Sequence, residues 1–253
     1  MIRFAASLLL LAASATAAAA AQAEKPVSVV LVHGAFVDGS GWRATSDILT
    51  RDGYEVLVVQ NPTVSLNGDV DVTKQVIARA KYPVVLVGHS YGGAIITEAG
   101  NDPRVKSLVY ISAFAPDNGE TVFQLATTPV PGEPGPPLLP PNNGFLLVDP
   151  VEFPQAFAAG ADPDQARFMA VSQVPWGVEA VRAPISNPAW KTKPSFFIVT
   201  TQDHMIPPTT MRMMARRAGG KTIEIQSSHA VMLTHPREVA HFIEQAASTQ
   251  EAR

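Results

Sequence analysis

The chain has 253 residues, of which 46% are hydrophobic and 16% charged, with 19 Lys and Arg against 22 Asp and Glu. This composition excludes a disordered chain, a collagen-like repeat and a coiled coil, and the net charge of -3 gives no electrostatic reason to expect nucleic acid or an anionic membrane as a partner. The absence of cysteine excludes disulfides, a thiolate nucleophile and Cys-ligated metal sites. Any chemistry therefore rests on Ser, His, Asp, Glu and backbone donors.

The first 23 residues have the order of a secretory signal peptide. One positive charge, Arg3, precedes an apolar run rich in leucine and alanine, which ends in the small-residue pattern Ala21-Gln22-Ala23. A membrane anchor is the alternative, because residues 4–21 carry no charge, although alanine and serine make this run a weak membrane segment. We therefore expect a signal peptide over 1–23. The mature chain would be exported, periplasmic or secreted, with no stable membrane insertion after cleavage.

From residue 27 onward, short apolar runs alternate with segments of helical spacing. Continuous β-branched runs predict strands that are buried on both faces. In chain order we expect a strand at 27–32, a helix at 42–51, a strand at 55–59, a helix at 69–81, a strand at 84–87, a helix at 90–99 and a strand at 105–111. Four strands that alternate with helices predict a doubly wound, mainly parallel α/β sheet with helices on both faces.

The segment 116–193 has a different character. Fifteen of the 22 prolines lie between Pro116 and Pro194, and this density prevents helix interiors and central strands. We expect a proline-rich lid inserted over the sheet, with short helices at about 120–126, 151–159 and 164–173. The sheet pattern then resumes with a strand at 195–200, a helix at 209–217, a strand at 222–225 and a helix at 235–247. The predicted core, 24–115 and 194–253, thus has about six strands.

A nucleophile is predicted at Ser90, the centre of the motif Gly88-His89-Ser90-Tyr91-Gly92. The motif lies between a predicted strand and a predicted helix. A sharp turn there strains the backbone of the central residue, requires glycine on either side and exposes the serine hydroxyl at the positive end of the helix. The alternative is a packing turn in which Ser90 only caps the helix.

A serine needs a base that is oriented by an acid. Asp203 follows the predicted strand that ends near Thr200, and His229 follows the last predicted strand, in the chain order Ser, acid, His. Loops at the carboxyl ends of parallel strands meet at one edge of a sheet, so these side chains are expected to converge. Asp117 is a rival acid. We interpret the remaining candidates as structural or solvated: His204, His235, His241 and Glu224.

Ester cleavage also needs donors for the developing oxyanion. The loop after the first strand contains His33-Gly34-Ala35-Phe36, beside the predicted nucleophile. The backbone N–H groups of Ala35 and Tyr91 are the expected pair. His33 is interpreted as a buttress that fixes this loop through side-chain hydrogen bonds, rather than as a base or metal ligand. We expect no metal and no cofactor.

Together these motifs resemble the α/β-hydrolase superfamily, in particular the compact branch of plant methyl-ester esterases, hydroxynitrile lyases and bacterial carboxylesterases. The residues that carry the resemblance are His33-Gly34-Ala35, Gly88 to Gly93, Asp203 with Ile206-Pro207, and Ser228-His229-Ala230. The resemblance implies an α/β-hydrolase fold and a serine carboxylesterase mechanism. It implies Ser90 as nucleophile, Asp203 as acid, His229 as base, and Ala35 with Tyr91 as oxyanion donors.

Two departures weaken the lyase reading. The lyases of this branch have threonine where this chain has Gly34, and lysine directly after the catalytic histidine where this chain has Ala230. Without that cation a leaving cyanide has no evident stabiliser. The alternatives to ester hydrolysis are non-hydrolytic chemistry on the same triad, as in lyases and perhydrolases (historically haloperoxidases), and a ligand-binding receptor on the same fold.

Aromatic residues in and near the lid suggest a substrate pocket. Either they only attach the lid to the sheet, or some of them line an apolar pocket over Ser90. The substrate-binding candidates are Phe36, Phe114, Phe123, Phe153, Phe157, Phe168 and Trp176. Only four basic residues lie in the lid, so a polyanionic substrate is disfavoured. We expect a small, uncharged, moderately apolar ester as the substrate; the sequence leaves the oligomeric state open.

Overall fold

The structure is a computed structural model that describes residues 26–249, so the predicted signal peptide lies outside the described residues. A six-stranded sheet, parallel throughout, has the order β2-β1-β3-β4-β7-β8. Its strands are β1 (Ser28–Val32), β2 (Glu55–Val59), β3 (Val84–Ser90), β4 (Val105–Ala113), β7 (Ser195–Thr200) and β8 (Lys221–Ile225). The predicted α/β-hydrolase architecture is therefore confirmed.

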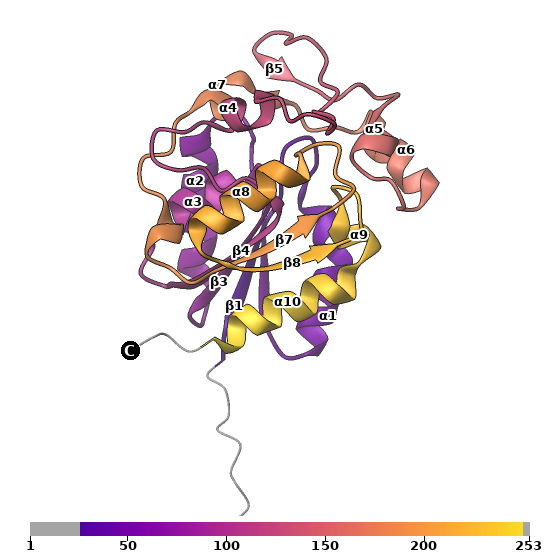
Figure 1. Cartoon of the computed structure of the whole chain (residues 1–253). Helices are drawn as coiled ribbons and strands as arrows, with labels where there is room; N and C mark the ends of the chain where they lie inside the picture. The colour runs from indigo at the N-terminus through magenta and orange to yellow at the C-terminus, as the bar shows by residue number, and fades with distance from the viewer. Residues whose placement is uncertain (1–25, 250–253) are drawn as a thin grey trace, which may run out of the picture.

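Helices cover both faces of this sheet (Figure 1). The chain moves one way from β1 to β2 and then reverses, so right-handed crossovers place the helices on opposite faces. On one face α1 (Arg43–Arg51), preceded by the 3-10 turn η1 (Gly39–Trp42), packs against α10 (Pro236–Ser248). The other face carries α2 (Leu66–Arg79), α3 (Gly92–Ala99) and α8 (Pro208–Ala218). No helix in the described part of the chain is both long and apolar enough to cross a bilayer.

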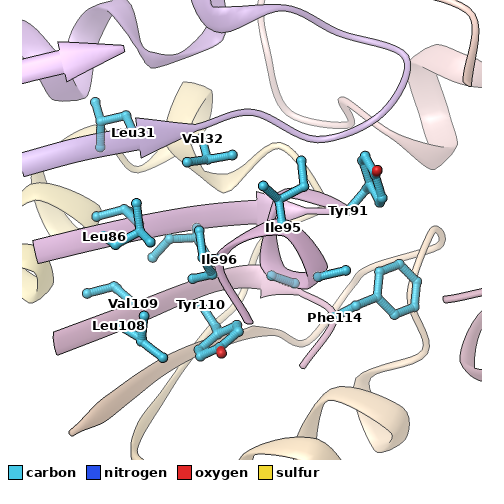
Figure 2. Packing of buried hydrophobic residues seen from close by; sticks show 14 of the residues in the cluster. Leu31, Val32, Leu86, Tyr91, Ile95, Ile96, Leu108, Val109, Tyr110 and Phe114 are labelled. Atoms are coloured by element: carbon cyan, nitrogen blue, oxygen red, sulfur yellow. The ribbon is translucent and has the colours of Figure 1, made fainter. Parts of the chain in front are cut away.

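The core lies where the central strands meet α3. β1 and β3 are buried at every position, as expected of strands covered on both faces. Leu86 of β3 and Leu108 of β4 are register partners and lie near Ile95 and Ile96 of α3 (Figure 2). These strands form the rigid support from which the site residues project.

Two predicted boundaries move for local reasons. The strand predicted at 84–87 continues to Ser90, and the helix predicted from residue 90 begins at Gly92, so Ser90 does not cap the helix. The helix predicted at 235–247 is preceded by a separate short helix, α9 (Val231–Thr234), and α10 then starts at Pro236. Proline is tolerated in a first turn, where its missing N–H has no helical partner.

The lid lies between β4 and β7, above one end of the sheet (Figure 1). It contains the three predicted short helices, α4 (Val122–Thr127), α5 (Phe153–Ala156) and α6 (Pro163–Val171). It also contains elements that the sequence did not indicate: α7 (Val178–Arg182), the 3-10 turn η2 (Ala189–Lys191), and a two-stranded sheet of β5 (Phe145–Leu146) and β6 (Trp176–Gly177). The division into a core (24–115 and 194–253) and a lid (116–193) stays a prediction.

Candidate active site

Ser90 stands at a strained turn between β3 and α3. Its φ of 55° lies in the left-handed region that non-glycine residues rarely adopt. The flanking glycines are required by space: a Cβ on Gly88 would lie 2.5 Å from the carbonyl oxygen of Gly92, and a Cβ on Gly92 would lie 2.7 Å from that of Val32. Tyr91 caps α3. The predicted strand–turn–helix geometry is thus present around Ser90, which is 8% exposed.

Asp203 and His229 form a buried pair. The Asp203 carboxylate lies 2.8 Å from His229 Nδ1, and neither side chain is exposed. The second carboxylate oxygen accepts the backbone N–H groups of Met205 and Ile206, each at 2.8 Å, and Thr200 Oγ1 donates to the oxygen that faces the imidazole. With every lone-pair direction used in this way, the carboxylate is fixed and can orient the imidazole.

The His229 ring lies next to His89, the residue before Ser90. His89 Nε2 lies 3.0 Å from the carbonyl oxygen of His229, and the two rings are 4.6 Å apart. His229 Nε2 has no hydrogen-bond partner among residues 26–249, and Ser90 Oγ is not bonded to it in this structure. The free Nε2 is the atom that a base needs for accepting a proton, and hydrogen bonds of this kind often tighten only with substrate present.

The oxyanion loop is fixed as predicted. His33 Nδ1 lies 2.8 Å from the carbonyl oxygen of Gly34, and its Nε2 accepts the backbone N–H of Asn61 at 2.8 Å. Both ring nitrogens are engaged and burial lowers the pKa of His33, so it is a neutral buttress. Ala35 and Tyr91, the expected donors, are both buried.

The competing titratable groups have other partners. Asp117 pairs with Lys191, and Glu224 with Arg212. His235 bonds Thr234. His204 lines a separate polar groove, and His241 lies exposed on α10. Of the two predicted acids, the structure brings only Asp203 to His229.

A cavity of about 130 Å³ lies beside this site. Its wall includes the direct chain neighbours of three site residues: Phe36 after Ala35, His89 before Ser90, and Ala230 after His229. Three of the predicted substrate-binding residues line it, namely Phe36, Phe157 and Phe168. The cavity is also lined by residues of η1 and α9 that no sequence pattern indicated: Trp42, Met232 and Leu233.

The other four predicted substrate-binding residues do not line this cavity. Phe114 is buried, and its backbone N–H donates to the carbonyl of Ser90 at 3.1 Å. Phe123 lies under the Arg182 guanidinium, and Phe153 stacks on Phe157. Trp176 packs against Phe36 and Tyr91. Trp176 thus joins the lid to the core, whereas the contacts of Phe123 and Phe153 lie within the lid.

Comparison with known proteins agrees with this geometry. The model of the alpha/beta hydrolase family matches residues 29–242. The chain belongs to this family.

Individual relatives match different lengths of this chain. A carbendazim hydrolyzing esterase of Nocardioides sp. is 35% identical over 118 residues, which cover 41% of this chain and 49% of that relative, or about half its length. A pyrethroid hydrolase of Sphingobium wenxiniae is 26% identical over 253 residues, covering 85% of each chain. The crystal structure of the Arabidopsis methylesterase MES16 is 17% identical, covers 88% of this chain and 99% of its own, and superposes with a TM-score of 0.71. At that identity the likeness concerns the fold.

Proposed function

We propose that this chain is a serine hydrolase that cleaves small, uncharged, moderately apolar carboxylic esters through an acyl-enzyme intermediate. The observation that carries the proposal is the buried Asp203–His229 hydrogen bond, which leaves Nε2 of the imidazole buried and without a partner in residues 26–249. An imidazole held in this way has one tautomer available, with the proton on Nδ1 and a free lone pair on Nε2.

In the proposed mechanism, Ser90 Oγ attacks the ester carbonyl carbon and its proton passes to His229 Nε2. Asp203 stabilises the resulting imidazolium, while the backbone N–H groups of Ala35 and Tyr91 hold the oxyanion. The tetrahedral intermediate expels the alcohol, which takes the proton from His229. Water then repeats the sequence on the acyl-enzyme, so that the acid leaves and Ser90 is restored.

Two observations support the substrate class. The relatives include an esterase, a methylesterase and a pyrethroid hydrolase, so ester substrates agree with the names that these proteins carry. The cavity beside the site is lined mainly by aromatic and aliphatic side chains, and Asp38 is the one Asp, Glu, Lys or Arg among its lining residues. A site without a cation favours neutral over anionic esters.

The lyase alternative is disfavoured by space as well as charge. A Cβ placed on Gly34 would lie 2.6 Å from the Cβ of Ser90, so a threonine at this position requires the nucleophile to move. Ala230 supplies no cation beside His229, and it is fully buried.

The test is a panel of p-nitrophenyl and methyl esters, neutral and anionic, assayed with the wild type and Ser90→Ala. We expect neutral esters to be hydrolysed with an initial burst of one alcohol equivalent, and Ser90→Ala to lower kcat by roughly 10⁴-fold or more. Activity that survives Ser90→Ala contradicts the mechanism, and absent turnover favours a receptor. Equal rates on neutral and anionic esters contradict the substrate class.

We also propose that the chain is exported and cleaved after Ala23. The motif at residues 21–23 supports this. N-terminal sequencing of the secreted protein is expected to begin at Glu24, and an intact Met1 contradicts the proposal.

A further inference from the structure

A carboxyl group lies buried beneath the nucleophile turn with no cation beside it. Asp69, in the first turn of α2, is fully buried, and no lysine or arginine pairs with it in residues 26–249. One of its oxygens accepts the backbone N–H of Thr63 at 2.8 Å, and the other accepts the hydroxyl of Tyr91 at 2.7 Å. Burial raises the pKa of Asp69. Burying such a group is costly unless it is hydrogen-bonded, so the two bonds to Thr63 and Tyr91 are needed to keep Asp69 in place.

One of its partners is directly linked to the oxyanion hole. Tyr91 follows Ser90, and its backbone N–H is one of the two proposed oxyanion donors. Its side chain is fully buried at the carboxyl end of β3, as Figure 2 shows. The hydrogen bond to Asp69 therefore fixes the residue that carries the donor.

The other partner joins Asp69 to the lid. Thr63 has a φ of 58°, its Oγ1 donates to the carbonyl of Pro175 at 2.8 Å, and its own carbonyl accepts the N–H of Gly177 at 2.8 Å. A Cβ on Gly177 would overlap the carbonyl oxygen of Val64, so glycine is required for this close approach. The chain is thus fixed to the core immediately before and after Trp176.

Trp176 packs against Tyr91, one of the two oxyanion residues, and against Phe36, the neighbour of the other. Its ring lies 5.1 Å from the ring of Tyr91 and 5.6 Å, edge to face, from that of Phe36, which follows the other donor residue. The N–H of Val174 donates to the carbonyl of Phe36 at 3.2 Å. The lid segment Val174–Gly177, which we call the strap, therefore contacts both sides of the oxyanion hole.

We propose that Trp176 of the strap and Asp69, through its buried carboxyl, are positioning residues that keep the two oxyanion donors, the backbone N–H groups of Ala35 and Tyr91, correctly oriented. This inference rests on the proposed function. The lid is then part of the catalytic framework, because Trp176 of the strap contacts Phe36 and Tyr91 while Asp69 accepts hydrogen bonds from Tyr91 and Thr63. Loosening either contact misdirects an N–H group. The binding of the transition state is then weakened more than the binding of the substrate.

The first test removes one hydroxyl. Tyr91→Phe deletes the bond to Asp69 but keeps the ring and the backbone N–H. Tyr110→Phe is the matched control, because Tyr110 is equally buried, bonds Thr97 at 3.0 Å and lies in the middle of β4. Two ligands of one skeleton are compared: a trifluoromethyl ketone, which forms a tetrahedral oxyanion on Ser90, and the methyl ketone, which reports ground-state binding.

For Tyr91→Phe we expect kcat and the affinity for the trifluoromethyl ketone to fall by about 10-fold, which is less than the loss expected when an oxyanion donor is removed entirely. The affinity for the methyl ketone should stay within about twofold of the wild-type value. Tyr110→Phe is expected to change neither affinity by more than about twofold, although both variants melt at lower temperature. Equal effects of Tyr91→Phe on the two ketones, or no effect on either, overturn the inference.

The second test addresses the strap and covers the case in which Tyr91→Phe does not fold. Trp176→Phe keeps an aromatic ring and is expected to retain most of the trifluoromethyl ketone affinity, whereas Trp176→Leu is expected to lose about 10-fold. Full affinity in Trp176→Leu overturns the role of the strap. A wild type that hydrolyses no ester and binds no trifluoromethyl ketone overturns the proposed function and this inference together, whereas an active wild type with insensitive variants overturns the inference alone.

Discussion

The carboxyl edge of the sheet and the lid are held together by different means. At the edge, Ser90, Asp203 and His229 are almost fully buried, and each stands at or shortly after the end of a strand. The strands β3 and β7 are buried throughout, whereas β8 is partly exposed. The lid consists of short helices and proline-rich connections, and its outer side exposes large apolar residues: Val151, Phe168 and Val171. Its inner side, by contrast, is as buried as the core, at Phe153, Phe157 and Trp176.

The comparison shows where precision is needed. Reacting groups must stay within a fraction of an ångström of their partners, and strands buried on both faces provide that rigidity. The lid needs fixed positions only where it contacts the site, so order is concentrated on its inner face. We therefore expect substitutions at the edge to affect catalysis most. Substitutions on the inner lid should affect stability and, at Trp176, the oxyanion hole as well, whereas substitutions on the outer lid should change stability little.

The largest effect is expected for the acid. Asp203→Asn places an amide where the imidazole needs an acceptor, so His229 takes the tautomer with its proton on Nε2 and can no longer act as a base. We expect kcat for a p-nitrophenyl ester to fall by about 10³- to 10⁴-fold. The matched control is Asp117→Asn at the start of the lid, where the carboxylate pairs with Lys191 and a change within about threefold is expected. Comparable losses in both variants refute the assignment of the acid.

A second prediction separates the two sides of the lid. Phe157 is 1% exposed, stacks on Phe153 and lies 4.8 Å from the His229 ring, whereas Phe168 is 68% exposed. In urea unfolding we expect Phe157→Ala to lower the free energy of unfolding by about 3–5 kcal/mol. Phe168→Ala is expected to change it by less than about 0.5 kcal/mol. Equal costs at the two positions show that the lid is uniformly ordered and break the comparison.

The smallest effect concerns pH. Burial lowers the pKa of both His33 and His89, so each is neutral in the folded chain at pH values where the unfolded chain binds a proton. Below about pH 6.5 the unfolded state therefore binds more protons than the folded state. As the pH is lowered, the free energy of unfolding falls by at most about 1.4 kcal/mol per pH unit for each group. Asp69, with its raised pKa, acts with the opposite sign at lower pH.

The measurement is denaturant unfolding at pH 7.5 and 5.5, for the wild type and His89→Gln. We expect the wild type to lose stability on acidification, and the variant to lose about 1 kcal/mol less, because the contributions of His33 and Asp69 cancel in the difference. Identical pH dependence of the two proteins contradicts the neutral state assigned to His89.

Much of the candidate site follows from local sequence. The turn around Ser90 is encoded by glycines at positions where side chains would overlap backbone atoms, and the strand before it is a continuous apolar run. Asp203 follows the buried strand β7, and His229 follows the partly exposed strand β8, in which polar and apolar residues alternate. Since parallel strands end at one edge, chain order alone brings these residues together. The hydrogen bonds of His33 confirm that it buttresses the loop after β1. This role could be predicted because β1 is the neighbour of β3 in the sheet.

The lid was less predictable. Its proline content indicates an insertion without stating which side chains turn inward. Phe123 and Phe153 have the same apolar character as Phe157 and Phe168, yet only the latter two line the cavity. Trp42 and Leu233, which lie nearly 200 positions apart in the chain, complete its wall.

The amino-acid sequence by itself determined the order of the strands along the chain, the strained turn and the three polar residues at the sheet edge, because each depends on spacing and on local backbone chemistry. Only the tertiary structure decided that Asp69 lies buried against Tyr91 and that Trp176 lies against both Tyr91 and Phe36. Asp69 has the pattern of an ordinary acid in the first turn of a helix, and such a residue is usually solvated. Its burial results from packing among α2, α3 and the lid, which no local pattern records.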